Sequence, residues 1–211
     1  MSLLFPRKCI LCRKVLSDQE TDLCHECRKT VPEIEKAKLK ISFVARWAAV
    51  WYYKDNVRRS ILRYKFYNGR SYAEVYGRVL AMKIQKEDMD FDVLTYVSTG
   101  WLRRWKRGYD HAALLCEAVA KELGVTSIKT LKKIRQTKPQ SRIRDAAVRR
   151  ANILGAYKVI DPELVKGKRV LLLDDVITTG ATVSECAKVL LIAGAKEVSC
   201  AAVAAASHDK K

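Results

Sequence analysis

One stretch near the C-terminus constrains the fold of this chain more than any other. Residues 170–173 are all Val or Leu, Asp174 and Asp175 follow directly, and residues 178–182 are only Thr, Gly and Ala. A short run of Val and Leu is typical of a central strand in a parallel sheet. We expect that strand to end at Leu173. Both aspartates would then lie at its carboxyl end, where open α/β sheets form their ligand crevices.

The small residues after the acidic pair predict an anion site. They leave backbone N–H groups free to point at a bound anion, and Gly180 is expected to let the backbone approach it closely. A helix is expected to follow, capped by Thr182 or Ser184 and running through Leu191, and the positive end of its dipole favours the same anion. The alternative is an ordinary strand–turn–helix in which the aspartates only cap the strand end. The acidic pair and the small-residue loop, in this order, favour a ligand site.

Residues 170–182 resemble the phosphoribosyl-pyrophosphate (PRPP) signature of the type I phosphoribosyltransferases. The resemblance implies an α/β fold with an open, mainly parallel sheet flanked by helices. It also implies that Asp174 and Asp175 are the catalytic pair on the ribose hydroxyls, and that PRPP binds with Mg²⁺. The residues implied for the 5-phosphate loop are Val176, Thr178, Thr179, Gly180, Ala181 and Thr182.

The N-terminus carries a second strong motif, two C-x-x-C pairs separated by eleven residues. This spacing predicts one tetrahedral Zn²⁺ held by four thiolates, from Cys9, Cys12, Cys24 and Cys27. The polar segment between the pairs has no core of its own, so it needs a metal to fold. Disulfides and a redox pair are disfavoured alternatives, and His25 is an alternative ligand. We expect residues 1–35 to form a zinc-binding module and residues 36–211 the phosphoribosyltransferase-type domain.

The composition is unusual in its large excess of basic residues over acidic residues. The 211 residues carry a formal net charge of +18, which predicts anionic partners, either nucleic acid or phosphorylated small molecules. No apolar run approaches the roughly 18 residues of a membrane-spanning helix, and no secretory segment is recognised, so we expect a cytoplasmic protein. The remaining thiols lie in apolar surroundings and are expected to be core residues: Cys116, Cys186 and Cys200.

A motif in the middle of the chain adds a resemblance to a more specific family. Residues 107–110, Arg-Gly-Tyr-Asp, resemble the Arg-Gly-(Phe/Tyr)-(Asn/Asp)-Gln element of the ComF family, with His111 in place of Gln. These are competence-associated proteins with an N-terminal zinc finger and a phosphoribosyltransferase domain. The resemblance implies a pyrophosphate side formed by Ser98, Thr99, Arg103, Arg104, Arg107 and Arg135. It also implies a basic flap within residues 132–150 and a role in natural transformation.

Two hypotheses follow for the function. The first is Mg²⁺-dependent binding of PRPP, with or without transfer of the ribosyl group to an amine or base. The second is a non-catalytic protein that handles single-stranded DNA for the DNA-uptake machinery and uses the PRPP site as a regulatory ligand site. Residues 101–107 suit the second, because cations can follow a phosphate backbone while an indole stacks on a base. The residues concerned are Trp101, Arg103, Arg104 and Lys106.

Periodicity predicts the remaining elements. We expect strands at 41–53, 91–98, 128–134 and 197–207, with 91–98 as the first parallel strand, and helices at 55–67, 72–84 and 111–123.

Overall fold

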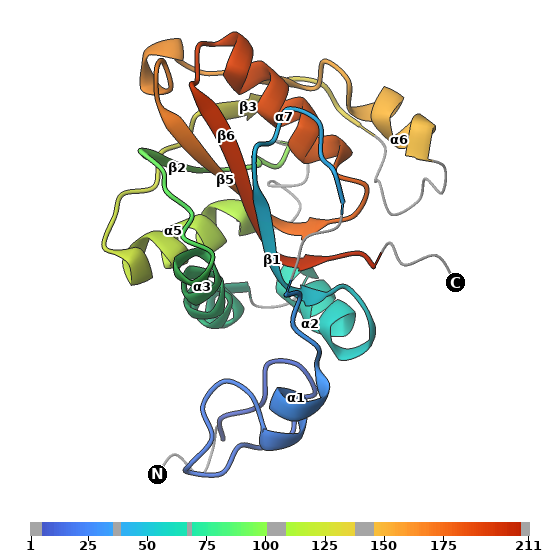
Figure 1. Cartoon of the computed structure of the whole chain (residues 1–211). Coiled ribbons are helices and arrows are strands. Elements are labelled where there is room, and N and C mark those ends of the chain that lie inside the picture. The colour runs from blue at the N-terminus through green and yellow to red at the C-terminus, as the bar shows by residue number, and fades with distance from the viewer. Residues whose placement is uncertain (1–5, 36–38, 67–68, 101–108, 138–145, 208–211) are drawn as a thin grey trace.

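The computed structural model describes residues 6–35, 39–66, 69–100, 109–137 and 146–207 (Figure 1). In chain order the elements are α1 (His25–Thr30), β1 (Trp47–Tyr52), α2 (Asp55–Phe66), α3 (Gly69–Lys86), β2 (Val93–Tyr96), α5 (His111–Leu123), β3 (Leu131–Lys133), α6 (Ala146–Ile153), β4 (Tyr157–Val159), the 3₁₀-helix η2 (Pro162–Leu164), β5 (Arg169–Ile177), α7 (Ala181–Ile192) and β6 (Glu197–Ala205).

The central sheet is open and parallel, as predicted. Its strand order is β1-β6-β5-β2, and each neighbouring pair is parallel. The first parallel strand is β1, so the expectation that 91–98 comes first was wrong. The segment 41–53 is also less regular than expected, because only Trp47–Tyr52 pairs with β6. A separate antiparallel pair, β3 and β4, lies beside this sheet.

Strand β5 is longer than the sequence indicated, and both aspartates lie inside it rather than after it. Pairing with β2 ends at Tyr96 and Leu173, but β6 continues to pair with β5 as far as Ile177 and Ala205. The acidic pair is therefore beyond the end of one neighbouring strand and still bonded to the other. This half-open position is the carboxyl edge at which a ligand crevice is expected.

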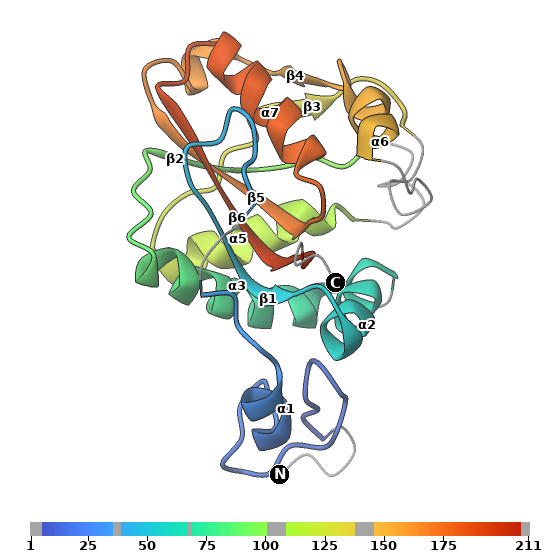
Figure 2. The same ribbon diagram turned by 45° about the vertical axis from the view of Figure 1, so that its right-hand side comes forward.

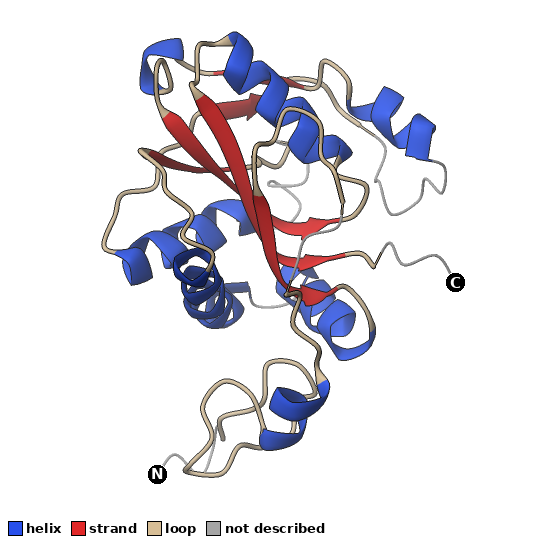
Figure 3. Ribbon diagram, viewed as in Figure 1, coloured by secondary structure: helices blue, strands red, loops and turns tan. Residues whose placement is uncertain are grey.

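The sheet separates two hydrophobic cores, as Figures 2 and 3 show by the helices on its two faces. Successive side chains of a strand point to opposite faces. Leu171 and Leu173 pack with residues of α2, α3 and α5, whereas Val170 and Leu172 pack with residues of α7, β3 and β4. The full burial of all four side chains explains the continuous Val and Leu run.

The helices lie close to their predicted ranges, with one correction at α7. Neither Thr182 nor Ser184 caps this helix. The N-cap is Gly180, in the left-handed conformation with φ of 72°, and no side chain caps the helix. Asp110 caps α5 by accepting hydrogen bonds from the N–H groups of Ala112 and Ala113.

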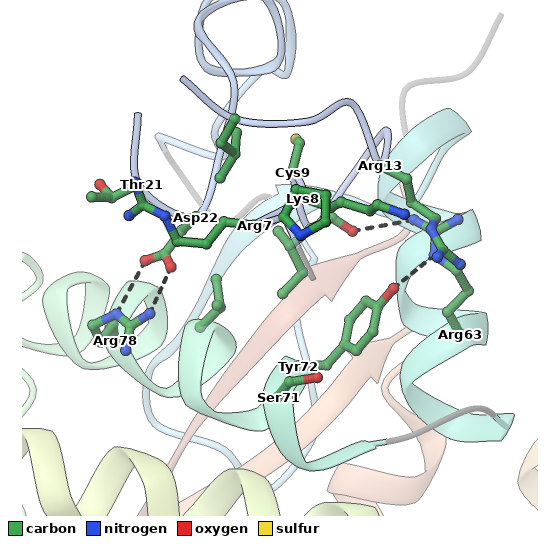
Figure 4. A pocket seen from close by; sticks show the side chains of 14 residues that line it. Arg7, Lys8, Cys9, Arg13, Thr21, Asp22, Arg63, Ser71, Tyr72 and Arg78 are labelled. Carbon is green, nitrogen blue, oxygen red and sulfur yellow. Dashed lines mark hydrogen bonds and ion pairs between the residues drawn. The ribbon is translucent and has the colours of Figure 1, made fainter. Parts of the chain in front are cut away.

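The N-terminal segment lies against α2 and α3 (Figure 1). Ser60 Oγ donates to the carbonyl of Ile10 at 2.6 Å, and Arg78 binds both carboxylate oxygens of Asp22, at 2.6 and 3.1 Å. A hollow of about 1030 Å³ lies along this seam, and Figure 4 shows Arg63 and Arg78 in its walls. These two arginines already bind groups of the N-terminal segment, so the hollow marks where that segment docks.

No helix in the described part of the chain is long and apolar enough to cross a membrane.

Candidate functional site

The four predicted zinc ligands come together at the N-terminus. The sulfur atoms of Cys9, Cys12, Cys24 and Cys27 all lie within 4.8 Å of one another, and Cys12 Sγ is 3.6 Å from Cys24 Sγ. A tetrahedral Zn²⁺ with bonds of about 2.3 Å places its sulfurs about 3.8 Å apart, so the arrangement fits this ion. His25 is not part of the cluster, because it opens α1 and its N–H donates to Glu20.

The backbone around the cluster favours thiolates. Burial acts to raise the pKa of Cys9, but the N–H groups of Cys12, Cys24 and Leu11 outweigh it and lower that pKa to about 7. Burial and the neighbouring thiols raise the pKa of Cys27. The pKa values of Cys9 and Cys27 are thus shifted in opposite directions, and a cation bound between the four cysteines would stabilise all of them as thiolates. The cluster therefore supports a structural zinc.

The other three thiols are core residues, as predicted. Cys116, Cys186 and Cys200 are buried, and burial raises the pKa of each.

The side chains of Asp174 and Asp175 lie in different surroundings. Asp175 is buried, and it faces the helices on the α2 and α5 side of the sheet. Lys65 Nζ lies 2.8 Å from its Oδ1, and His111 Nε2 lies 2.7 Å from its Oδ2. Asp174 is partly exposed, and its Oδ1 accepts a hydrogen bond from the backbone N–H of Asp175 at 2.8 Å. The two carboxylates are therefore not equivalent.

Electrostatics separates the two carboxylates further. Burial acts to raise the pKa of Asp175, but Lys65 and His111 outweigh it and hold that pKa well below its usual range. Burial also acts to lower the pKa of Lys65, and the Asp175 carboxylate reverses this and raises it. No ion pair of Asp174 is found among the described residues, and burial and the charge of Asp175 raise its pKa to about 8. Such divergent carboxyl pKa values are typical of functional sites.

Unsatisfied hydroxyl groups lie at the ends of the two central strands. The buried oxygens Ser98 Oγ and Thr99 Oγ1 follow β2, and Thr179 Oγ1 follows β5, and none has a hydrogen-bond partner among the described residues. Buried hydroxyls without partners are costly, so they indicate a place where a polar ligand completes the bonds. These hydroxyls and the Asp174 carboxylate lie at the same edge of the sheet, and oxygen donors are the type that Mg²⁺ prefers.

The predicted phosphate loop follows directly, and Gly180 has a packing role in addition to the predicted one. A Cβ on Gly180 would lie 2.9 Å from Cγ1 of Ile41, so the missing side chain makes room for Ile41. Val176 is still in β5, Ala181 is the first residue of α7, and Thr178 and Thr182 are half-buried.

The pyrophosphate-side residues are only partly placed. Arg135 donates to the carbonyls of Asn152 and Leu154, at 3.0 and 2.6 Å, which ties it to the turn before β4. The charge of Lys133, on β3, acts to lower the pKa of Asp174, as does that of Lys65. Outside the described residues lie the predicted loop residues Trp101, Arg103, Arg104, Lys106 and Arg107, together with residues 138–145 of the predicted flap.

Sequence reasoning missed Lys65 and His111 as site residues. Lys65 fits the helical pattern of α2, and nothing in that pattern links it to an aspartate 110 positions later. His111 carried a weak signal, because it replaces the Gln of the ComF element. Both residues reach the site only through the packing of α2 and α5 against the sheet.

The chain matches the family described as the phosphoribosyl transferase domain over residues 111–211, and the double zinc ribbon domain over residues 1–38. An open parallel sheet with this acidic pair therefore defines a protein with the type I phosphoribosyltransferase fold. The chain is 25% identical to "Competence protein F" of Haemophilus influenzae, over 92% of this chain and 95% of that protein. This similarity extends over nearly the whole chain and includes both the zinc ribbon segment and the phosphoribosyl transferase segment.

Other relatives match over a shorter part. "DNA utilization protein YhgH" of Salmonella typhi is 38% identical over 100 residues, which are 46% of this chain and 43% of that protein. Among solved structures, the glutamine PRPP amidotransferase of B. subtilis matches 67% of this chain and 30% of its own, with 22% identity and a TM-score of 0.46.

Proposed function

We propose that the chain binds PRPP together with Mg²⁺ at the carboxyl edge of β2 and β5. The observation that carries the proposal is the set of hydroxyls without described partners, Ser98 Oγ, Thr99 Oγ1 and Thr179 Oγ1, at the same carboxyl edge of the sheet as Asp174. In this arrangement the loop 178–182 and the N-terminus of α7 hold the 5-phosphate. Ser98 and Thr99 face the pyrophosphate side, and Asp174 binds a ribose hydroxyl.

Asp174, Ser98 and Thr99 would hold Mg²⁺ together with ligand oxygens, and the ion would offset the charge of pyrophosphate. If ribosyl transfer takes place, the leaving pyrophosphate takes the electron pair of the C1–O bond and an amine or base forms the new bond to C1. Lys133 and the basic residues of the predicted flap are the cations available to the leaving group. The support for Lys133 is that its charge acts to lower the pKa of Asp174.

Calorimetry with PRPP, with and without Mg²⁺, tests this proposal. PRPP is expected to bind more tightly than inorganic phosphate, and Asp174→Asn is expected to weaken PRPP while leaving phosphate binding largely intact. Equal losses for both ligands would show that Asp174 is structural. Release of pyrophosphate in the presence of a panel of bases and amines would identify an enzyme, whereas binding without release would identify a ligand-gated scaffold.

A second function has its own support. The relatives carry the names "Competence protein F" and "DNA utilization protein", and the net charge is +18. We propose that the chain takes part in DNA uptake, with single-stranded DNA bound by the basic loop of residues 101–107.

A salt series measures this. Affinity for a single-stranded oligonucleotide should fall with salt with a log–log slope of roughly 0.7 per phosphate contact. Arg103→Ala with Arg104→Ala should flatten that slope, and Trp101→Ala should weaken binding without changing it. An unchanged slope in the double variant would move the DNA site to another basic segment.

We also propose the division of the chain at residue 35. Support comes from the clustering of the four cysteines before this point and of all sheet strands after it. A cytoplasmic location remains a prediction of the sequence.

A further inference from the structure

Three consecutive residues of α2 contact three distant parts of the molecule. Arg63 Nη2 donates to the carbonyls of Ile10 and Leu11, which lie between the first two zinc ligands, at 3.1 and 2.6 Å. The Tyr64 hydroxyl donates to the carbonyl of His111. Lys65 Nζ binds the carboxylate of Asp175 at 2.8 Å. Successive residues of a helix point about 100° apart, so one turn can contact the zinc module, α5 and the sheet together.

We propose that this turn of α2 couples the zinc module to the PRPP site: Lys65 and His111 are positioning residues that fix Asp175, and Arg63 fixes the turn itself by binding the zinc module. The inference rests on the proposed PRPP site and extends it. Neither the acidic motif nor the cysteine motif contains any of these three residues.

The first step of the argument concerns Asp175. Each of its two carboxylate oxygens has a nitrogen partner within 2.8 Å, and its side chain is buried. A carboxylate held on both oxygens in a buried site is an anchor more than a ligand group. Its own backbone N–H donates to Asp174 Oδ1 at 2.8 Å. Fixing Asp175 therefore also orients the carboxylate that is partly exposed at the crevice.

The second step concerns the stiffness of the connection. Ser60, Tyr64 and Tyr76 are fully buried. Ser60 Oγ lies 2.6 Å from the hydroxyl of Tyr76 and 2.6 Å from the carbonyl of Ile10. The Tyr64 and Tyr76 rings meet edge to face, with centroids 5.3 Å apart. Buried, hydrogen-bonded contacts of this kind leave little room for α2 to move independently of the zinc module.

The third step concerns the zinc. The carbonyls that Arg63 and Ser60 bind belong to Ile10 and Leu11, within the loop that joins Cys9 to Cys12. A metal bound by these cysteines fixes the conformation of that loop and hence the positions of both carbonyls. The zinc module is therefore expected to act on PRPP binding without touching the ligand.

The test compares PRPP affinity, measured by calorimetry on zinc-loaded full-length protein, across four variants. Lys65→Met, His111→Leu and Arg63→Met each remove one link, and Arg59→Met is the matched control because Arg59 is an exposed residue of the same helix. Each of the three links is a close polar contact that involves a charged group, so its loss is expected to weaken PRPP by about tenfold or more. Arg59→Met should bind PRPP as wild type does.

Three further readouts separate positioning from folding. His111→Gln keeps a donor for Asp175 and should restore most of the affinity lost in His111→Leu. Inorganic phosphate should bind equally to all variants, because the phosphate loop lies outside the coupled residues. The chain has three histidines, so its imidazole NMR spectrum is simple, and His111→Gln assigns one signal set by removing it. Arg63→Met should shift the His111 signals while elemental analysis still finds zinc.

Unchanged PRPP affinity and unchanged His111 signals in Arg63→Met would overturn the coupling. Equal loss of phosphate and PRPP in Lys65→Met and His111→Leu would show that these residues only stabilise the fold. If wild-type protein does not bind PRPP at all, the proposed function fails, and the NMR comparison alone then decides whether α2 couples the zinc module to Asp175.

Discussion

Replacing Gly180 by alanine is expected to destabilise the protein through two separable effects. The first is conformational: Gly180 has φ of 72°, and a residue with a Cβ pays about 1–2 kcal/mol in the left-handed region. The second is steric, because the new Cβ would lie 2.9 Å from Cγ1 and 3.2 Å from Cγ2 of Ile41, which is itself buried. Overpacking of this kind costs about 1–3 kcal/mol. The expected loss is therefore about 2–5 kcal/mol of the free energy of unfolding.

A control and a double-mutant cycle separate the two effects. Gly124 has a similar φ of 68°, and a Cβ there would meet nothing within 4 Å. Gly124→Ala should therefore show only the conformational cost. Ile41→Ala removes the two γ-carbons that the new methyl would touch, so Gly180→Ala should cost less in that background than in wild type.

Denaturant unfolding of the zinc-loaded proteins measures the free energy of unfolding of wild type, of the three single variants and of the Gly180→Ala/Ile41→Ala double variant. Equal costs for Gly180→Ala and Gly124→Ala, together with no coupling to Ile41, would refute the steric argument. A Gly180→Ala variant of wild-type stability that still failed to bind phosphate would refute both effects and restore the simpler idea that Gly180 serves the ligand alone.

Three other predictions follow from the site. Protein prepared without added metal should contain one zinc per chain by elemental analysis. The Cys12→Ser variant, which alters the exposed ligand of the four, should lose this zinc. A metal-free protein with an ordered N-terminus would contradict the prediction. Thr179→Val removes a hydroxyl without a described partner, so the melting temperature should stay the same or rise. The affinity for phosphate and for PRPP should decrease. An undiminished affinity would show that the phosphate binds elsewhere. The pKa of Asp174 is raised in the fold from 3.8 to about 8. Between these two pH values the folded state holds a proton that the unfolded state has lost. The stability that this group contributes should therefore decrease as the pH rises from about 4 to about 8. Asp174→Asn should therefore gain stability relative to wild type at pH 8.5 compared with pH 4 in chemical unfolding, and an equal difference at both pH values would contradict the assignment.

The sequence by itself determined the parts whose chemistry is local. The four cysteines lie in two C-x-x-C pairs, so covalent spacing alone brings each pair of sulfurs together, and the structure gathers them within 4.8 Å. The Val and Leu run, the acidic pair and the small-residue loop are likewise contiguous, and they correctly predicted the parallel sheet and the match to the phosphoribosyl transferase domain over residues 111–211. Helices α2, α3 and α5 followed from periodicity because each buries one apolar face.

The tertiary structure decided the length of β5 and the directions of its two aspartates. The strand reaches Ile177 because β6 offers hydrogen bonds beyond the end of β2, and no feature of residues 170–177 records the length of β6. Within a strand, neighbours point to opposite faces, so Asp174 and Asp175 were bound to separate once the strand included them. The sequence analysis placed Asp174 and Asp175 together after the strand, and it therefore assigned both of them the same role on the ribose.

The partners of these residues were beyond sequence reasoning for the same reason. Lys65 and His111 reach Asp175 from α2 and α5, and Ile41 reaches Gly180 from the connector before β1. Such contacts depend on how helices and loops pack over the sheet, and that packing is the sum of many weak, non-directional contacts spread over the whole core. Local chemistry is encoded residue by residue, whereas the encounter of residues a hundred positions apart is encoded only in the fold.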